Sequence, residues 1–351
     1  MALNQVGLER LGTSVTDKIG ENKNLIINGA MQLSQRGTSF ADSANGSYTL
    51  DRFNIQNSSG TPAFTVTQDS DAPHGFNNSL KVACTTADTS PAAGSFSRIR
   101  HTIEAQNLSS LAKGTASAKA QTLSFYVKTN KTGVYTVFIY DDDNNRMFSA
   151  SYTVSDTNWN RYTIDVPADT SGAINDDNGA GYVIHWGLSL GSNRTSGSLA
   201  STWATYATAN EHVGNVNFAD NTSNVWAITG VQLEVGTVAT DFEHRSFAEE
   251  LALCQRYYIL NGQKMGNCGR SHSMSGFDMI MSVNFIFPVQ MRATPSVTTA
   301  DIVLKNDSDG NETANVNNVS QYGHQYGIKK VGSGNEDYGI QIQNFKYDAE
   351  L

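Results

Sequence analysis

Short stretches in which apolar and polar residues alternate dominate the chain from residue 24 to residue 245. In "QTLSFYVKT", Leu123, Phe125 and Val127 occupy every second position. A period of two residues is typical of a β-strand with one buried face. Glycine, asparagine and aspartate separate these stretches and favour tight turns. The pattern predicts an antiparallel β-sandwich, and roughly eight to ten such segments suit a jelly roll.

One convincing helical pattern follows the predicted sandwich. Ser246 and Glu249 have the S-x-x-E spacing of a capping box, and they predict a helix over 247–258. Four apolar residues at spacings of four, three and four form one helical stripe, namely Phe247, Leu251, Cys254 and Tyr258. Such stripes from three chains would form a trimer core, but packing against the chain's own sandwich explains them equally well.

The alternation divides the chain into four parts. Residues 1–23 carry a weak apolar pattern broken by glycines, which indicates an arm that orders against another protein. Residues 24–245 form the predicted jelly-roll sandwich, 246–259 the linking helix and 260–351 a small C-terminal β domain. Within this last part, Pro288 indicates that its strand lies at a sheet edge or ends in a bulge. The predicted fold class is mainly β.

Composition and charge exclude several kinds of partner. The chain has 351 residues, 16% of them charged, and a net charge of −9. It has no lysine or arginine cluster for nucleic acid, no apolar run of the roughly 20 residues that a membrane span needs, and no signal-peptide pattern. The three cysteines, Cys84, Cys254 and Cys268, show no metal or redox spacing, so we expect free thiols in a chain folded in a reducing cytoplasm.

Three clusters rich in aspartate and asparagine are candidate calcium loops. They cover 141–146, 176–181 and 306–312, and their oxygen atoms are of the type that calcium prefers. None has the full EF-hand pattern, and a solvated turn between strands explains each of them. The first cluster sits between two alternating runs, as a hairpin loop would. Structural calcium is the only cofactor that the sequence leaves open.

Catalytic motifs are missing from the sequence. No nucleophile elbow or phosphate-binding loop is present. His244 lies near Asp241, Glu243 and Cys254, but the start of a helix favours carboxylates without catalysis. We therefore expect no enzyme activity. A pair of carboxylates that cleaves polysaccharide stays an alternative, because the spacing of such a pair is set in three dimensions.

Aromatic and polar side chains give the candidate ligand-binding residues. Trp203 and Tyr206 lie in a long polar segment between residues 191 and 224, where exposed rings can stack on sugars. Trp186 shares its alternate positions with core residues. Five further side chains fall on the opposite faces of the presumed strands and would line a polar concave surface: Arg98, Arg100, Tyr126, Tyr140 and His185. An ordinary solvated sheet face is the competing interpretation.

Several motifs resemble those of tailed-bacteriophage fibre or spike proteins. They include "NLIINGAMQLSQRGTSF", "YTLDRF", "WAITGVQLEVGTVATDFEHRSFAEELALCQRYY" and the ending "YDAEL". The 24–245 portion also resembles the jelly rolls of carbohydrate-binding modules. The resemblance implies an external virion appendage, usually a homotrimer, that contacts a host glycan or protein without catalysis. Residues 1–23 would then attach to other virion proteins. A purely structural capsid or tail component and a polysaccharide depolymerase are the alternatives.

Overall fold

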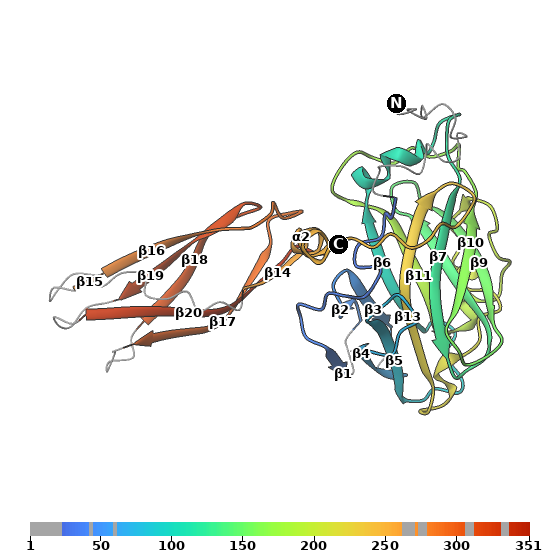
Figure 1. Ribbon diagram of the computed structural model, residues 1–351, viewed down its shortest axis with the longest axis horizontal. Helices are drawn as coiled ribbons and strands as arrows, with labels where there is room; N and C mark the ends of the chain where they lie inside the picture. Colours follow the sequence, from blue (N-terminus) through green and yellow to red (C-terminus); the bar gives the residue numbers. More distant parts are fainter. Residues whose placement is uncertain are drawn as a thin grey trace, which may run out of the picture.

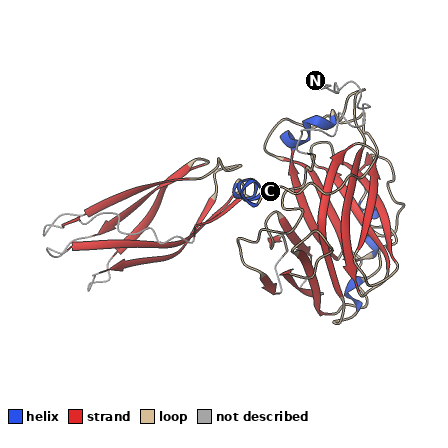
Figure 2. Ribbon diagram, in the orientation of Figure 1, coloured by secondary structure: helices blue, strands red, loops and turns tan. Residues whose placement is uncertain are grey.

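The computed structural model describes residues 23–41, 45–58, 62–261, 271–272, 279–305, 312–330 and 337–351. Two β lobes are joined by one α-helix (Figure 1). Strands fill both lobes, while helical segments are confined to connections (Figure 2). The predicted mainly β fold with a sandwich is confirmed. Residues 1–22, which make up nearly all of the predicted arm, lie outside the described residues.

The larger lobe is a sandwich of two antiparallel sheets. The six-stranded sheet has the order β1 (Ser39–Ala41), β4 (Ala63–Asp69), β5 (Ser79–Thr86), β13 (Val225–Val235), β7 (Gln121–Thr129) and β10 (Asn160–Val166). The seven-stranded sheet has the order β12 (Ala204–Thr205), β9 (Arg146–Val154), β8 (Gly133–Asp141), β11 (Ala180–Leu190), β6 (Phe96–Glu104), β3 (Phe53–Asn57) and β2 (Ser47–Tyr48). Strands that follow one another in the chain often belong to different sheets, as in a jelly roll.

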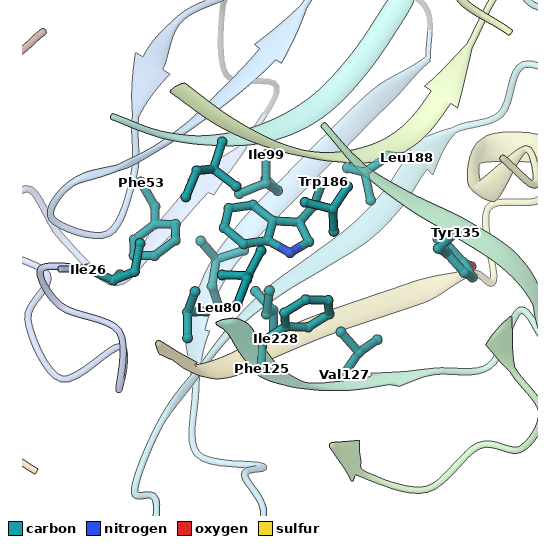
Figure 3. Close-up of a cluster of buried hydrophobic side chains, with 14 of the residues drawn as sticks. Ile26, Phe53, Leu80, Ile99, Phe125, Val127, Tyr135, Trp186, Leu188 and Ile228 are labelled. Atoms are coloured by element: carbon teal, nitrogen blue, oxygen red, sulfur yellow. The ribbon is translucent and has the colours of Figure 1, made fainter. Parts of the chain in front are cut away.

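The core lies between the inner faces of the two sheets. Leu123, Phe125 and Val127 of β7 are completely buried, as their alternation predicts. Trp186 of β11 is also completely buried and meets the ring of Phe125 edge-on at a centroid distance of 6.0 Å (Figure 3). Phe53 of β3 lies 6.4 Å from Trp186 on the other side. Removing a large ring from such a core costs about 3–5 kcal/mol.

A β-bulge in β13 changes which residues of that strand face the core. Trp226 and Ile228 are buried before the bulge, and Val231 and Leu233 after it. The pairing with β7 shifts between Thr229 and Gln232, so one extra residue reverses the alternation. The bulge therefore lets apolar residues on both sides of it face the same core.

The long segment after β11 crosses the outer face of the seven-stranded sheet. It contains three short 3₁₀ helices, η3 (Ser192–Arg194), η4 (Thr208–Asn210) and η5 (Phe218–Asp220), besides the short strand β12. Backbone hydrogen bonds tie it to the sheet beneath, including Ser149 N to Ala200 O at 2.9 Å and Val216 N to Val134 O at 2.7 Å. We call residues 192–220 the covering segment. A fourth 3₁₀ helix, η2 (Ala105–Leu111), follows β6.

The linking helix is α2 (Phe247–Gln255). Its capping box is confirmed, because Ser246 accepts from the Glu249 amide while Glu249 accepts from the Ser246 amide. The helix ends three residues earlier than predicted, because Tyr258 already begins strand β14 (Tyr258–Asn261).

The apolar stripe of α2 packs against its own chain. Cys254 is 1% exposed in a cluster with Ile27, Leu33 and Tyr257, and Leu251 packs against this cluster. Tyr258 is 3% exposed, whereas Phe247 is 59% exposed. The prediction that the whole stripe forms a trimer core is therefore wrong, because most of its surface is covered within the chain. The homotrimer itself stays a prediction.

The smaller lobe consists of two antiparallel sheets. One contains β14, β15 (Ser271–His272) and β17 (Ser296–Lys305), all paired with β20 (Asp337–Asp348). The other has the order β16 (Met279–Ile286), β19 (Gly323–Lys330) and β18 (Glu312–Ser320). β16 is an edge strand of this sheet, which confirms the edge position that Pro288 predicts. Among the described helices, none is long and apolar enough to cross a bilayer.

Buried ion pairs hold the two lobes together at what we call the lobe junction, formed by residues 23–36, 48–52, Glu104, 243–258 and 348–351. Arg52 is completely buried and pairs with Glu350, and its guanidinium carbon lies 3.4 Å from the centroid of the Tyr257 ring. Arg256 holds both carboxylate oxygens of buried Glu104 at 2.8 Å. Buried ions of this kind are tolerated only when they are paired.

The Asn28-Gly29 turn also belongs to the lobe junction. Asn28 has a φ of 60°, and its carbonyl accepts from the Met31 amide at 2.9 Å. Its own amide donates to Glu250 Oε1 of α2 at 2.5 Å, and its side chain donates to the carbonyls of Leu33 and Asp51. The turn thus connects the first segment of the sandwich to the helix.

Candidate functional site

The side chains expected to line one polar surface lie on two opposite faces of the sandwich. Arg98 and Arg100 belong to β6, Tyr140 to β8 and His185 to β11, all in the seven-stranded sheet. Tyr126 belongs to β7 in the six-stranded sheet, so the prediction that it shares this surface is wrong. Alternation shows which side of its own strand a residue occupies, but the jelly-roll connection decides which sheet holds that strand.

Trp203 is a core residue, and the expectation that it is exposed is wrong. Its side chain is 9% exposed, and its Nε1 donates to the carbonyl of Pro167 at 2.9 Å. The ring stacks on Tyr182 at a centroid distance of 5.3 Å, with the Lys113 ammonium 5.2 Å from its centroid. The prediction failed because the residues around Trp203 are polar, as in an exposed loop, although the covering segment folds back onto the sandwich.

Tyr206 lies beside a buried ion cluster on the outer face of the seven-stranded sheet. Glu211 Oε2 accepts from Arg98 Nη1 at 3.0 Å and from Arg194 Nη1 at 2.5 Å. The hydroxyl of half-buried Tyr206 donates to Glu211 Oε1 at 2.6 Å. Burial lowers the pKa of Arg98 to about 10, although the Glu211 charge opposes that shift. Two guanidinium groups therefore share one carboxylate, which anchors the covering segment to β6.

Two histidines fill the space beneath the covering segment. His185 stacks on Phe138 at 5.2 Å with an interplanar angle of 11°, and His212 meets the same ring edge-on at 5.9 Å. His212 Nδ1 lies 2.8 Å from Thr136 Oγ1. Burial lowers the pKa of both imidazoles well below its usual value, and the charge of Arg98 lowers it further. Both rings are therefore neutral parts of a buried layer, so His185 is not the exposed surface residue that we expected.

Arg100 lies next to this layer and is only half-buried. Its neighbours in register are Asn54 on β3 and His185 on β11. Among the described residues, no acceptor lies within hydrogen-bond distance of Arg100 Nε, and no carboxylate forms an ion pair with Arg100. Three buried polar atoms also lack a hydrogen-bond partner in the described part of the chain: Asn54 Oδ1, Thr102 Oγ1 and His185 Nδ1. Buried polar groups nearly always have a partner in folded proteins. We call Asn54, Arg100, Thr102 and His185 the polar row.

Tyr140 and Tyr206 supply aromatic surface near the polar row. Their rings meet edge-on at a centroid distance of 5.2 Å, and both are half-buried. Tyr140 is paired in register with Val183, which in turn pairs with Thr102 of the polar row. Exposed Asp142 follows directly after β8. Burial raises the pKa of Asp142, and the nearby Arg100 charge opposes the rise.

The outer face of the six-stranded sheet carries a second aromatic group, which we call the aromatic patch. Phe76 lies 5.5 Å from Tyr126, 5.0 Å from Phe242 and 5.3 Å from His244, between ring centroids. His244 is exposed and the other three rings are half-buried. Phe76 and Phe242 are on loops, where no periodic pattern could single them out.

The residues around His244 have structural roles. Glu243 accepts hydrogen bonds from the backbone amides of Lys23 and Asn24 at 3.1 and 2.8 Å. Cys254 is buried in the cluster beneath α2. Glu243 and Cys254, which stand near His244 in the sequence, therefore form part of the lobe junction.

In the described ranges, no group of three or more histidine, cysteine, aspartate or glutamate residues is arranged to hold a metal ion. Residues 141–146 form the predicted hairpin between β8 and β9, and Asp141 is paired with the Lys113 ammonium. Of the cluster at 306–312, residues 306–311 lie outside the described residues. Calcium binding stays a prediction. Cys84 and Cys254 are buried free thiols.

No protein-family model matches the chain, and no curated protein matches it significantly. One solved structure that resembles the chain is a Bacteroides thetaiotaomicron protein described provisionally as sugar-binding. The two are 14% identical with a TM-score of 0.34, and the match covers 61% of this chain and 100% of that one. The xylan-binding domain CBM22-1 of a Paenibacillus barcinonensis protein has 9% identity and a TM-score of 0.29, covering 57% of this chain and 94% of that one.

A third structure is the family 11 carbohydrate-binding module of Clostridium thermocellum in complex with a β-1,3-1,4-mixed-linked tetrasaccharide. It has 11% identity and a TM-score of 0.29, covering 59% of this chain and 98% of that chain. These TM-scores, all below 0.5, give no basis for an argument about function. The fold class rests on the two packed sheets themselves.

Proposed function

We propose that this protein binds glycans without catalysis, and that it does so on the outer face of the seven-stranded sheet. The observation that carries the proposal is that half-buried Arg100, which has no hydrogen-bond partner among the described residues, lies on the same face as the half-buried rings of Tyr140 and Tyr206. A sugar ring offers C–H groups that pack on an aromatic face, and hydroxyls that need donors and acceptors. Arg100, Tyr140 and Tyr206 supply both kinds of contact within one surface.

Affinity electrophoresis tests this proposal. The purified protein is run through gels that contain single neutral polysaccharides (xylan, mixed-linked β-glucan, galactan) or acidic ones (polygalacturonate, alginate, chondroitin sulfate). We expect at least one polysaccharide to retard the protein, and Tyr140→Ala to weaken binding about tenfold. Tyr140→Phe should retain most of the binding, because it keeps the ring.

Tyr126→Ala, on the aromatic patch of the opposite face, is the matched control and should bind normally. Loss of binding in Tyr126→Ala with full binding in Tyr140→Ala would move the site to the aromatic patch. If no polysaccharide retards the protein, the proposed function is rejected. Release of reducing ends from a bound polysaccharide would instead favour the depolymerase alternative.

We further propose that the protein is an external appendage of a phage particle, as a fibre or spike that contacts the host surface. Support comes from the resemblance of the sequence motifs quoted above, many of which make up the lobe junction. The attachment of residues 1–23 to other virion proteins and the homotrimer belong to this proposal. Antibody labelling of intact particles in electron micrographs tests it, and labelling confined to disrupted particles would favour a purely structural component.

A further inference from the structure

We infer that the outer face of the seven-stranded sheet selects acidic glycans, and that Arg100 pairs with the carboxylate or sulfate group of the sugar. This inference rests on the proposed glycan binding and names its ligand class. Every other arginine in the described part of the chain donates at least one hydrogen bond, and these are Arg36, Arg52, Arg98, Arg146, Arg161, Arg194, Arg245, Arg256 and Arg292.

The charges on this face favour an anion. Arg98 and Arg194 share the single buried carboxylate of Glu211, so the ion cluster already holds one more cation than anion. Arg100 adds a further positive charge without an ion pair among the described residues. Asp142 is exposed and forms no ion pair with Arg100 within 4.0 Å. The face is therefore locally positive in a chain whose net charge is −9.

The position of Arg100 also fits an anionic group. A planar guanidinium presents donors in a fork that matches the two oxygens of a carboxylate or sulfate. The strand pairing holds Arg100 between Asn54 and His185, both of which are at least nine-tenths buried and have an unpartnered polar atom. Arg100 thus projects from a strand that is paired on both sides, and not from a loop. A neutral sugar would satisfy the hydrogen bonds but would leave the charge uncompensated.

The experiment compares matched probes by isothermal titration. The probes are oligosaccharides of galacturonic acid, of galactose, and of sulfated galactose, all of equal length. We expect one of the two acidic probes to bind at least about tenfold more tightly than the galactose oligosaccharide. The acidic probe that binds more tightly identifies carboxylate or sulfate as the preferred group. Increasing salt should reduce this preference.

Arg100→Gln should abolish the preference for the acidic probe while keeping the binding of the neutral one. Lys128→Gln removes the same charge from an exposed side chain of the opposite sheet and should leave the preference unchanged. Equal affinity for acidic and neutral probes in the unmodified protein would overturn the inference but leave the proposed function intact. A preference that persists in Arg100→Gln would also overturn it. If none of the polysaccharides or probes binds, both statements fail together.

Discussion

At the scale of single residues, Gly230 shapes the aromatic patch through its backbone. Its φ is +61°, and it lies at the bulge of β13. A Cβ atom there would lie 2.7 Å from Phe76 Cζ and 2.9 Å from Tyr126 Cδ2. Glycine is therefore needed both for the backbone conformation and for the close approach of the two rings.

We predict that Gly230→Ala lowers the free energy of unfolding by about 2–4 kcal/mol, because backbone strain and overpacking add. The matched control is Gly214→Ala, where φ is +81° and nothing lies within 4 Å of the added Cβ. This control should cost only about 1 kcal/mol. Urea unfolding followed by fluorescence measures both variants, and equal losses would show that the rings do not resist the methyl group.

The residue scale also shows how far the sequence predicts the candidate site. The alternation of β6 correctly separates Arg98 and Arg100 from the buried side chains of Ile99 and Ile103. It contains no information on Glu211, which neutralises Arg98 from the covering segment. Which of the two arginines keeps a free charge depends on this tertiary contact, so the sequence alone could not distinguish Arg100 from Arg98.

At the scale of elements, polar contacts fix both ends of α2 in addition to the packing of its apolar stripe. The capping box fixes its first turn, and Arg256 follows directly after its last residue. Both carboxylate oxygens of Glu104 accept from Arg256, which ties the end of α2 to the end of β6. Burial opposes ionisation of Glu104, but the paired hydrogen bonds from Arg256 outweigh it and lower the pKa of this carboxyl.

We predict that Arg256→Met lowers the free energy of unfolding by about 3–5 kcal/mol, because it leaves the Glu104 charge buried without a partner. The double variant Arg256→Met with Glu104→Gln should recover part of this loss, since it removes the charge as well. Urea unfolding of the single and double variants measures the difference. If the double variant is as unstable as the Arg256→Met single variant, the unpaired charge is not the cause.

The elements themselves were largely predictable, and their partners were not. The alternation predicted β7, β8 and β9, and the capping box predicted α2, because each of these patterns is formed by residues close together in the chain. The strand pairs of the lobe junction depend on residues far apart in the chain, so no local pattern contains them. The end of α2 could not be predicted for the same reason. The helical spacing of apolar residues continues to Tyr258, but this residue pairs with Asp348 of β20 and belongs to a strand.

At the scale of the whole molecule, buried histidines make the stability of the sandwich depend on pH. Burial lowers the pKa of His101, His185 and His212 well below the usual value of 6.5. Below that pH, the unfolded chain takes up protons at these positions and the folded chain does not. The free energy of unfolding must therefore fall as the pH decreases.

We predict a loss of about 4 kcal/mol between about pH 7.5 and about pH 5.5, at about 1.4 kcal/mol for each histidine. Urea unfolding at the two pH values measures it, and most carboxyl groups remain ionised over this range. His101→Gln should reduce the loss by about one third. A free energy of unfolding that is the same at both pH values would contradict the prediction.

The contact between Arg52 and Glu350 also bears on the order in which the molecule is made. The two residues are 298 positions apart in the chain. A ribosome completes the last strand of the sandwich, β13, long before it reaches Glu350, and domains generally fold as units during synthesis, the N-terminal one first. A nascent sandwich would thus contain a buried guanidinium without its acid, and it would be less stable than the finished one. Glu350, and with it the smaller lobe, would therefore add stability to a sandwich that has already folded.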